Sequence, residues 1–148
     1  MSMSNAFESE ILDLIFNNAA IADIGDAGGL QPSATAGSLY ISLHTANPDE
    51  TGNQGSFETV YTNYVRVAVA RSGAGWTIAG NTATNAALIQ FAQCGATGAT
   101  ITHVGVGVSS VTFDTGLLLF SGALSSPLTV ANLIQPQFAA GDLDIVAD

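Results

Sequence analysis

Two histidines, one cysteine and a serine are the residues of this 148-residue chain that could support nucleophilic catalysis. A hydrolase would pair His44 or His103 with a nucleophile such as Cys94 or Ser42, and with a carboxylate that orients the imidazole ring. The chain has no Gly-x-Ser-x-Gly motif, and it cannot form a phosphate loop because it has no lysine. We therefore expect structural histidines, no catalytic residues and no enzymatic activity. Cys94, the only cysteine, is expected to be a free thiol that is buried or half-buried.

Carboxylate side chains gather in two places where they could bind calcium, which prefers oxygen ligands. One group is Asp49 with Glu50, and the other is Asp142 with Asp144 and Asp148. Neither group has the spacing of an EF-hand loop or of a calcium-binding repeat. A solvated acidic turn and a solvated acidic tail are the simpler interpretation, so we expect no metal site and no cofactor.

The aromatic side chains raise a separate possibility, a platform that stacks on sugars. Trp76, Tyr40, Tyr61 and Tyr64 carry suitable rings, but aromatic residues form only 7% of the chain and these four are scattered over different segments. Core packing is therefore the expected use of these rings.

The charge balance excludes whole classes of partner. The chain has 12 acidic residues against two basic ones, Arg66 and Arg71, for a formal net charge of -10. Neutralising phosphates requires several lysines or arginines on one face, so binding to nucleic acid or to an anionic membrane is not expected. Only 9% of residues are charged, against about 25% in ordinary soluble domains. The exterior is therefore expected to consist of Thr, Ser, Asn, Gln, Gly and Ala, or to be partly covered by neighbouring subunits of an assembly.

Targeting signals are not recognisable in the sequence. No segment reaches 18 consecutive apolar residues, which is the length expected of a membrane-spanning helix. The first residues also lack the basic charge that opens a signal peptide. We therefore expect neither export nor membrane insertion.

An amphipathic helix is predicted within residues 1–18. Asn5 is expected to be its N-cap, with Glu8 completing a capping box three residues later. Apolar side chains recur at helical spacing after this point. A helix of this length is marginal alone, so its apolar face must pack either on the protein's own sheet or on a partner.

A long loop or insertion is predicted at residues 19–37, which are rich in glycine and show no sustained period. A loop of about twenty residues in a compact domain is commonly functional, so we interpret it, together with the helix, as an interaction segment. The candidate interaction residues are Phe7, Ile11, Leu14, Ile15, Ile21, Ile24 and Leu30.

Short strands separated by turn residues are predicted for the rest of the chain. They are expected at residues 38–45, 64–71, 87–93, 100–109, 117–124, 128–130, 133–138 and 143–146. Eight strands without crossover helices predict an all-β fold, an antiparallel β-sandwich or jelly roll at residues 38–148, with the helix and loop completing one compact domain.

Gly105 and Gly107 alternate with valines in one strand, which predicts a very close neighbour on that face.

Six blocks in this order carry a resemblance to a known family. They lie at residues 4–12, 39–52, 64–67, 101–105, 116–124 and 138–145, among them Leu-Tyr-Ile-Ser-Leu-His-Thr-Ala-Asn-Pro at 39–48 and Phe-Ala-Ala-Gly-Asp-Leu-Asp-Ile at 138–145. Together they resemble a widespread family of small tailed-bacteriophage structural proteins, often labelled tail-fibre-like. The sequence departs from the family pattern between Asn18 and Ser38, where the family runs almost directly from helix to strand.

The resemblance implies a virion component that is assembled in the host cytoplasm. Two roles follow from it, a capsid decoration (cement) protein on the outer surface of the head and a tail fibre or tail-associated component involved in host adsorption. One compact domain provides neither a shaft nor a separate tip, so decoration is the favoured expectation. The implied partners are the major capsid protein or other virion proteins, and further copies of the chain in a dimer or trimer.

Overall fold

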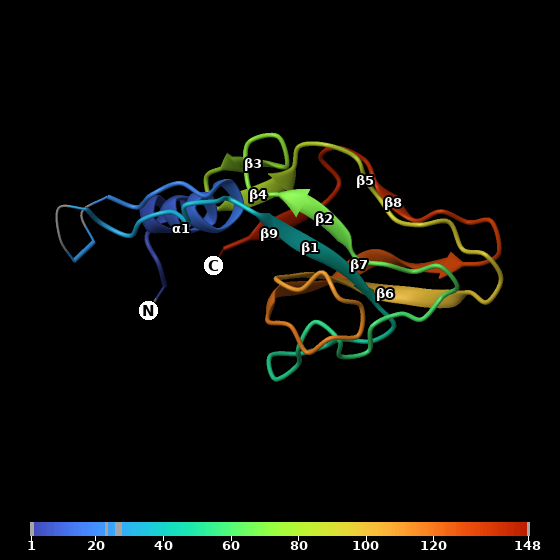
Figure 1. The fold of residues 1–148 in the computed structure, drawn as a ribbon. Coiled ribbons are helices and arrows are strands. Elements are labelled where there is room, and N and C mark those ends of the chain that lie inside the picture. The colour runs from blue at the N-terminus through green and yellow to red at the C-terminus, as the bar shows by residue number, and fades with distance from the viewer. Residues whose placement is uncertain (1, 23, 26–27, 148) are drawn as a thin grey trace. The chain divides into compact units, whose positions relative to one another are not determined.

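A computed structural model describes residues 2–22, 24–25 and 28–147 of the chain. In these residues one helix, α1 (Asn5–Asn17), precedes a series of strands (Figure 1). The strands are β1 (Ser38–His44), β2 (Val67–Ala70), β3 (Trp76–Ala79), β4 (Thr82–Asn85), β5 (Ile89–Gln90), β6 (Ala99–Gly107), β7 (Leu118–Val130), β8 (Gln137–Phe138) and β9 (Asp144–Val146). The expected class, mainly antiparallel β with one N-terminal helix, is confirmed.

The chain divides into two compact units. Unit 1 comprises Met1–Ser38, Ala70–Ile89 and Phe138–Asp148, and unit 2 comprises Leu39–Val69 and Gln90–Gln137. Each unit is therefore assembled from segments that are distant in the sequence. That the whole chain forms one compact domain stays a prediction.

The N-cap of the helix lies one residue before the predicted cap, Asn5. Ser4 has an extended backbone, and its side-chain oxygen accepts the backbone N–H of Phe7 at 3.4 Å, so Ser4 and not Asn5 is the N-cap. Both residues are good caps, and the extended conformation of Ser4 decides between them. The helix ends at Asn18, whose left-handed backbone lets its N–H bond to the carbonyl of Asp13.

Unit 1 packs one face of α1 on its own sheet. Leu12 and Phe16 are fully buried on this face, and the helix lies beside β3 and β4 (Figure 1). The Phe16 ring meets the Trp76 ring edge to face, with 4.6 Å between centroids. The helix face therefore contributes to a core within the chain, which was one of the two alternatives for it.

The sheet of unit 1 has the order β3-β4-β9 and contains a hairpin that the sequence pattern did not predict. β3 and β4 pair in antiparallel register, with Ala79 opposite Thr82, and Gly80 takes a positive φ of 61° in the turn between them. These strands consist largely of Ala, Thr and Asn, so no strong alternation of apolar and polar residues marks them.

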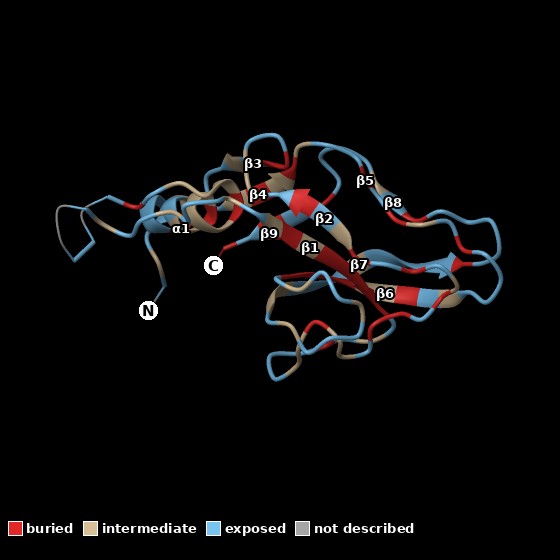
Figure 2. Cartoon of the chain, viewed as in Figure 1, coloured by how far each residue is buried: buried red, intermediate tan, exposed pale blue. Residues whose placement is uncertain are grey.

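Unit 2 is built on a sheet of order β2-β1-β6-β7. β1 is almost entirely buried (Figure 2), and Leu43 lies opposite Val104 in its antiparallel register with β6. A side chain on Gly105 would collide with His44 and Ser42, and one on Gly107 would collide with Gln54. The close approach expected at these two glycines is confirmed.

Several strand limits differ from their predictions. β2 begins at Val67 rather than at residue 64, and β5 and β8 have two residues each. β7 joins two predicted strands, 117–124 and 128–130, into one of 13 residues. Its register with β6 shifts between Ile101, which lies opposite Leu128, and His103, which lies opposite Ala123. The residues between the two predicted strands are therefore part of β7 as an irregular segment.

Candidate functional site

The candidate catalytic residues of the sequence are buried in unit 2 or held by local hydrogen bonds. His44 Nε2 lies 2.9 Å from Ser42 Oγ, His44 Nδ1 lies 2.8 Å from the carbonyl oxygen of Ser56, and the imidazole and hydroxyl are closed off from solvent. Burial lowers the pKa of His44 from its ordinary value. Cys94 is a buried free thiol that bonds to the carbonyl of Thr97, as expected. That the chain is not an enzyme stays a prediction.

The acidic clusters are used in local turns. Asp49 Oδ1 accepts hydrogen bonds from the N–H and the hydroxyl of Thr51, which lower the pKa of this carboxyl. Asp142 caps a turn through the N–H of Ala139, and Asp148 lies outside the described residues. Within residues 2–22, 24–25 and 28–147, no three His, Cys, Asp or Glu side chains gather as metal ligands would.

The aromatic rings serve mostly as core. Trp76, Tyr61 and Tyr64 are buried, as expected, while Tyr40 is half-buried. Tyr64 stacks on Phe91, and the Tyr61 hydroxyl donates to the carbonyl of Ala92. Burial raises the pKa of Tyr61 to about 12.

The candidate interaction residues at the N-terminus divide between core and surface. Ile21 is buried, and its backbone pairs with that of Leu30 through two hydrogen bonds. Phe7, Ile24 and Leu30 are exposed by about two fifths. Ile11, Leu14 and Ile15 are half-buried on the helix. An interaction role for these residues stays a prediction, with Ile21 the member least available to a partner.

Within unit 1, Arg71 holds this N-terminal segment through hydrogen bonds. Its guanidinium donates to the carbonyl oxygens of Leu14 at 2.7 Å, Ile15 at 2.6 Å and Ala36 at 3.1 Å. The first two carbonyls belong to the last turn of α1, where backbone acceptors lack partners and positive charge is favourable. Arg71 is therefore a C-terminal cap supplied from elsewhere in the sequence.

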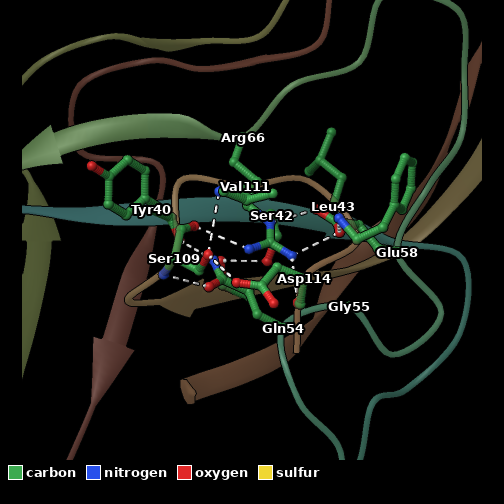
Figure 3. Close-up of polar contacts among 12 residues, drawn as sticks. Tyr40, Ser42, Leu43, Gln54, Gly55, Glu58, Arg66, Ser109, Val111 and Asp114 are labelled. Carbon is green, nitrogen blue, oxygen red and sulfur yellow. Dashed lines mark hydrogen bonds and ion pairs between the residues drawn. The ribbon is translucent and has the colours of Figure 1, made fainter. Parts of the chain in front are cut away.

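The strongest polar cluster in unit 2 surrounds an ion pair between Glu58 and Arg66 (Figure 3). Arg66 Nε donates to Glu58 Oε1 and Arg66 Nη2 to Glu58 Oε2, each at 2.8 Å, and neither side chain is exposed. The Tyr64 hydroxyl also donates to Glu58 Oε1, and the N–H of Leu43 donates to the Tyr64 oxygen. Burying these charges is tolerable because their hydrogen-bonding capacity is extensively used.

The ion pair holds two loops, Asn53–Val60 and Val108–Leu117, which we call the two-loop surface. Arg66 donates to the carbonyls of Ser109 at 3.0 Å and Asp114 at 3.1 Å. The N–H of Phe113 donates to Glu58 Oε2 at 2.7 Å. Gln54 adds two contacts between the loops, since its side-chain oxygen accepts the N–H of Ser109 and its backbone N–H donates to Gly116. Figure 3 shows Glu58, Ser109 and Asp114 around the guanidinium of Arg66.

The two-loop surface presents large apolar side chains to solvent. Phe57 is 58% exposed and Phe113 is 55% exposed. Both have a positive φ, 53° and 64°, which is costly for a bulky residue and is found where the surrounding structure imposes it. The other exposed apolar members of the two loops are Val60, Val108, Val111 and Leu117. Exposed large apolar side chains gathered on two hydrogen-bonded loops are typical of a binding site.

Sequence reasoning did not identify this surface. Glu58 and Phe113 are 55 positions apart, so no local period relates them. The one available signal was the charge count: a chain with only two arginines is expected to use each of them, and Glu58 lies eight positions before Arg66.

A small β-rich chain with exposed apolar side chains on two hydrogen-bonded loops, and with a mostly uncharged sequence, has the features of a structural subunit. Residues 2–146 match the family model described as podophage GP4 fiber I protein gp80, and the chain therefore belongs to this family. The resemblance to small tailed-phage structural proteins is confirmed, and the chain is a structural component of a bacteriophage virion. No match was found among the curated proteins. None of the helices in the described residues is long and apolar enough to cross a membrane.

Proposed function

We propose that this protein is a subunit of a podophage tail fibre, and that its two-loop surface binds a neighbouring virion protein. The family description supports a fibre role over the capsid decoration role that the sequence favoured. Capsid decoration is the alternative role, and the location of the protein in the virion distinguishes it from the fibre role.

The observation that carries the binding role is the pair of exposed phenylalanines in strained conformations. Side chains of this kind are commonly the anchors of protein interfaces, because they bury a large area with few rotatable bonds. The buried ion pair beneath them holds both loops before a partner arrives, which reduces the entropy lost on binding. Phe57 and Phe113 are therefore suited to insert into apolar pockets of a partner.

The charges support a protein partner rather than a nucleic acid or an anionic membrane. Arg66 is buried against Glu58, and the guanidinium of Arg71 donates to backbone carbonyls of unit 1. The chain has no lysine. Neither arginine is therefore available to neutralise phosphates, which is the main source of affinity for such ligands.

Location in the virion separates the two roles. Antibodies against this protein should label the tail of intact virions and block adsorption to host cells. Quantitative staining should give a small number of copies per particle. Hundreds of copies in icosahedral arrangement on the head would contradict the fibre role and establish decoration.

The binding surface is tested by substitution in the protein reconstituted with virions that lack it. The double variant Phe57→Ser, Phe113→Ser should fold but fail to associate with the particles. Leu88→Ser is the matched control, because Leu88 is also more than half exposed but belongs to unit 1. Undiminished association of the double variant would refute the assignment.

A further inference from the structure

We propose that the outer edge of β7 pairs with the same edge of a second copy of this chain, so that the two β7 strands form one antiparallel ladder about a two-fold axis. β7 ends the strand order β2-β1-β6-β7, so in the described part of the chain it has a strand neighbour on one side only. The backbone N–H and C=O groups on the outer side of such a strand can pair with a further strand.

The length and exposure of β7 distinguish it from the other edge strands. β7 has 13 residues, whereas β2 and β3 have 4 and β9 has 3. Ser121, Gly122 and Ala123 in its middle are all exposed. Proteins usually protect an edge by making it short or by placing charges on it, and β7 is neither short nor charged.

The distribution of charge favours a second copy as the occupant. Asp114 is the one formally charged residue between Arg71 and Asp142, so both β6 and β7 are uncharged. Two copies that each carry a net charge of -10 repel one another in most relative orientations. An uncharged strand is where two such chains can come into contact without opposing like charges at the interface.

The register within unit 2 limits where the pairing can occur. Phe120–Ala123 pair regularly with His103–Val106, whereas the register slips before residue 128 and Pro127 has no N–H to donate. The first half of β7 is therefore the part that can extend the ladder.

A two-fold pairing also accounts for how an exposed, uncharged edge avoids open-ended aggregation. In an isologous contact each copy uses the same strand, so the dimer has no β7 edge left to recruit a third copy. Leu118, Leu119 and Phe120 are half-buried in the single chain, and the neighbouring strand would cover more of their area. This inference does not require a particular place in the virion, and it is tested on the purified chain.

The first test is the mass in solution. At about 100 µM the wild-type chain should sediment as a dimer of twice its 15.0 kDa mass if the dissociation constant is micromolar or lower. Ser121→Glu places like charges across the axis and should weaken dimerisation at least about tenfold. Thr77→Glu, at an exposed position of β3, is the control and should leave the dimer intact. A monomeric wild type, or an oligomer unaffected by Ser121→Glu, would overturn the proposal.

The second test does not depend on the stability of a charge variant. Paired strands bring Cα atoms to about 4.5–5.5 Å, within the range that a disulfide spans. Under mild oxidation, at least one of Ser121→Cys, Gly122→Cys and Ala123→Cys should give a cross-linked dimer, while Thr77→Cys should not. The native Cys94 is buried and provides a low background. In a two-fold antiparallel ladder, only the residue on the axis lies opposite its own copy. Cross-linking no greater than that of Thr77→Cys at all three positions would therefore exclude a two-fold axis at residues 121–123.

Discussion

The backbone N–H of Phe113 donates to Glu58 Oε2 at 2.7 Å, and this bond joins the most strained part of one loop to the buried ion pair of unit 2. The same carboxylate oxygen accepts Arg66 Nη2. One buried group therefore both balances a charge and holds an exposed aromatic residue in its conformation.

Loss of Arg66 should strongly destabilise unit 2. Arg66→Met leaves the Glu58 carboxylate buried without its counter-charge and removes the bonds to Ser109 and Asp114. We expect the free energy of unfolding to fall by about 3–5 kcal/mol in urea denaturation. Glu50→Gln, at an exposed acid, should change it by less than about 0.5 kcal/mol. Equal stability of the two variants would contradict the structural role of the ion pair.

Glycine at position 113 should separate binding from stability. Phe113→Gly removes an exposed ring and relieves a positive φ that glycine adopts freely, while it increases the freedom of the unfolded chain. The free energy of unfolding should therefore stay within about 1 kcal/mol of the wild type, and association with virions should fall. A thermal melt and a co-sedimentation assay measure the two quantities. Full association would exclude Phe113 as an anchor.

The two faces of α1 should respond differently to truncation. Phe16→Ala removes a fully buried ring from its contact with Trp76 and should cost about 3–5 kcal/mol of unfolding free energy. Phe7→Ala removes a ring that is 37% exposed, and should cost less than about 1 kcal/mol. Chemical denaturation measures both values. A larger loss from Phe7→Ala would place the helix core on the opposite face.

Arg71 should be needed for the C-terminal end of α1. Arg71→Met retains much of the side-chain length but removes the donors to Leu14, Ile15 and Ala36. Helix content by far-ultraviolet circular dichroism should fall, and stability should decrease by about 1–3 kcal/mol because buried acceptors lose a charged donor. Arg71→Lys should recover only part of this loss, since an ammonium group cannot reproduce the geometry of a guanidinium. Full recovery with lysine would show that charge alone suffices.

Stability should decrease on mild acidification because of His44. Burial lowers the pKa of this imidazole in the folded chain. The positive charge of Arg66 lowers the pKa further, whereas the carbonyl of Ser56 and the charge of Glu58 oppose part of this shift. The unfolded chain therefore binds more protons than the folded chain at mildly acidic pH. The contribution of neutral His44 to the free energy of unfolding is fully present above the unfolded pKa of about 6.5, and it is lost as the pH falls through the lower pKa of the folded chain. Urea denaturation between pH 7 and pH 5 should show this fall in wild type and in His103→Gln. A constant free energy of unfolding across that interval would contradict it.

The sequence by itself determined the features that depend on composition and local period. The net charge of -10 and the absence of lysine predict that phosphate-rich partners do not bind, and the alternation in residues 38–45 predicted β1 almost to the residue. The helix was equally visible, although its cap lies at Ser4. These properties need no knowledge of distant segments, because each is set by residues that are neighbours in the chain.

Only the tertiary structure decided which distant residues meet. Glu58 joins Arg66 within eight positions but reaches Phe113 only across 55 positions, and Arg71 caps a helix 56 positions earlier. The β3–β4 hairpin also escaped prediction, because its Ala and Thr residues are given a strand role by the burial of Trp76 and Ala83 rather than by their own pattern. Contacts of this kind arise from packing between segments, which a local period does not encode.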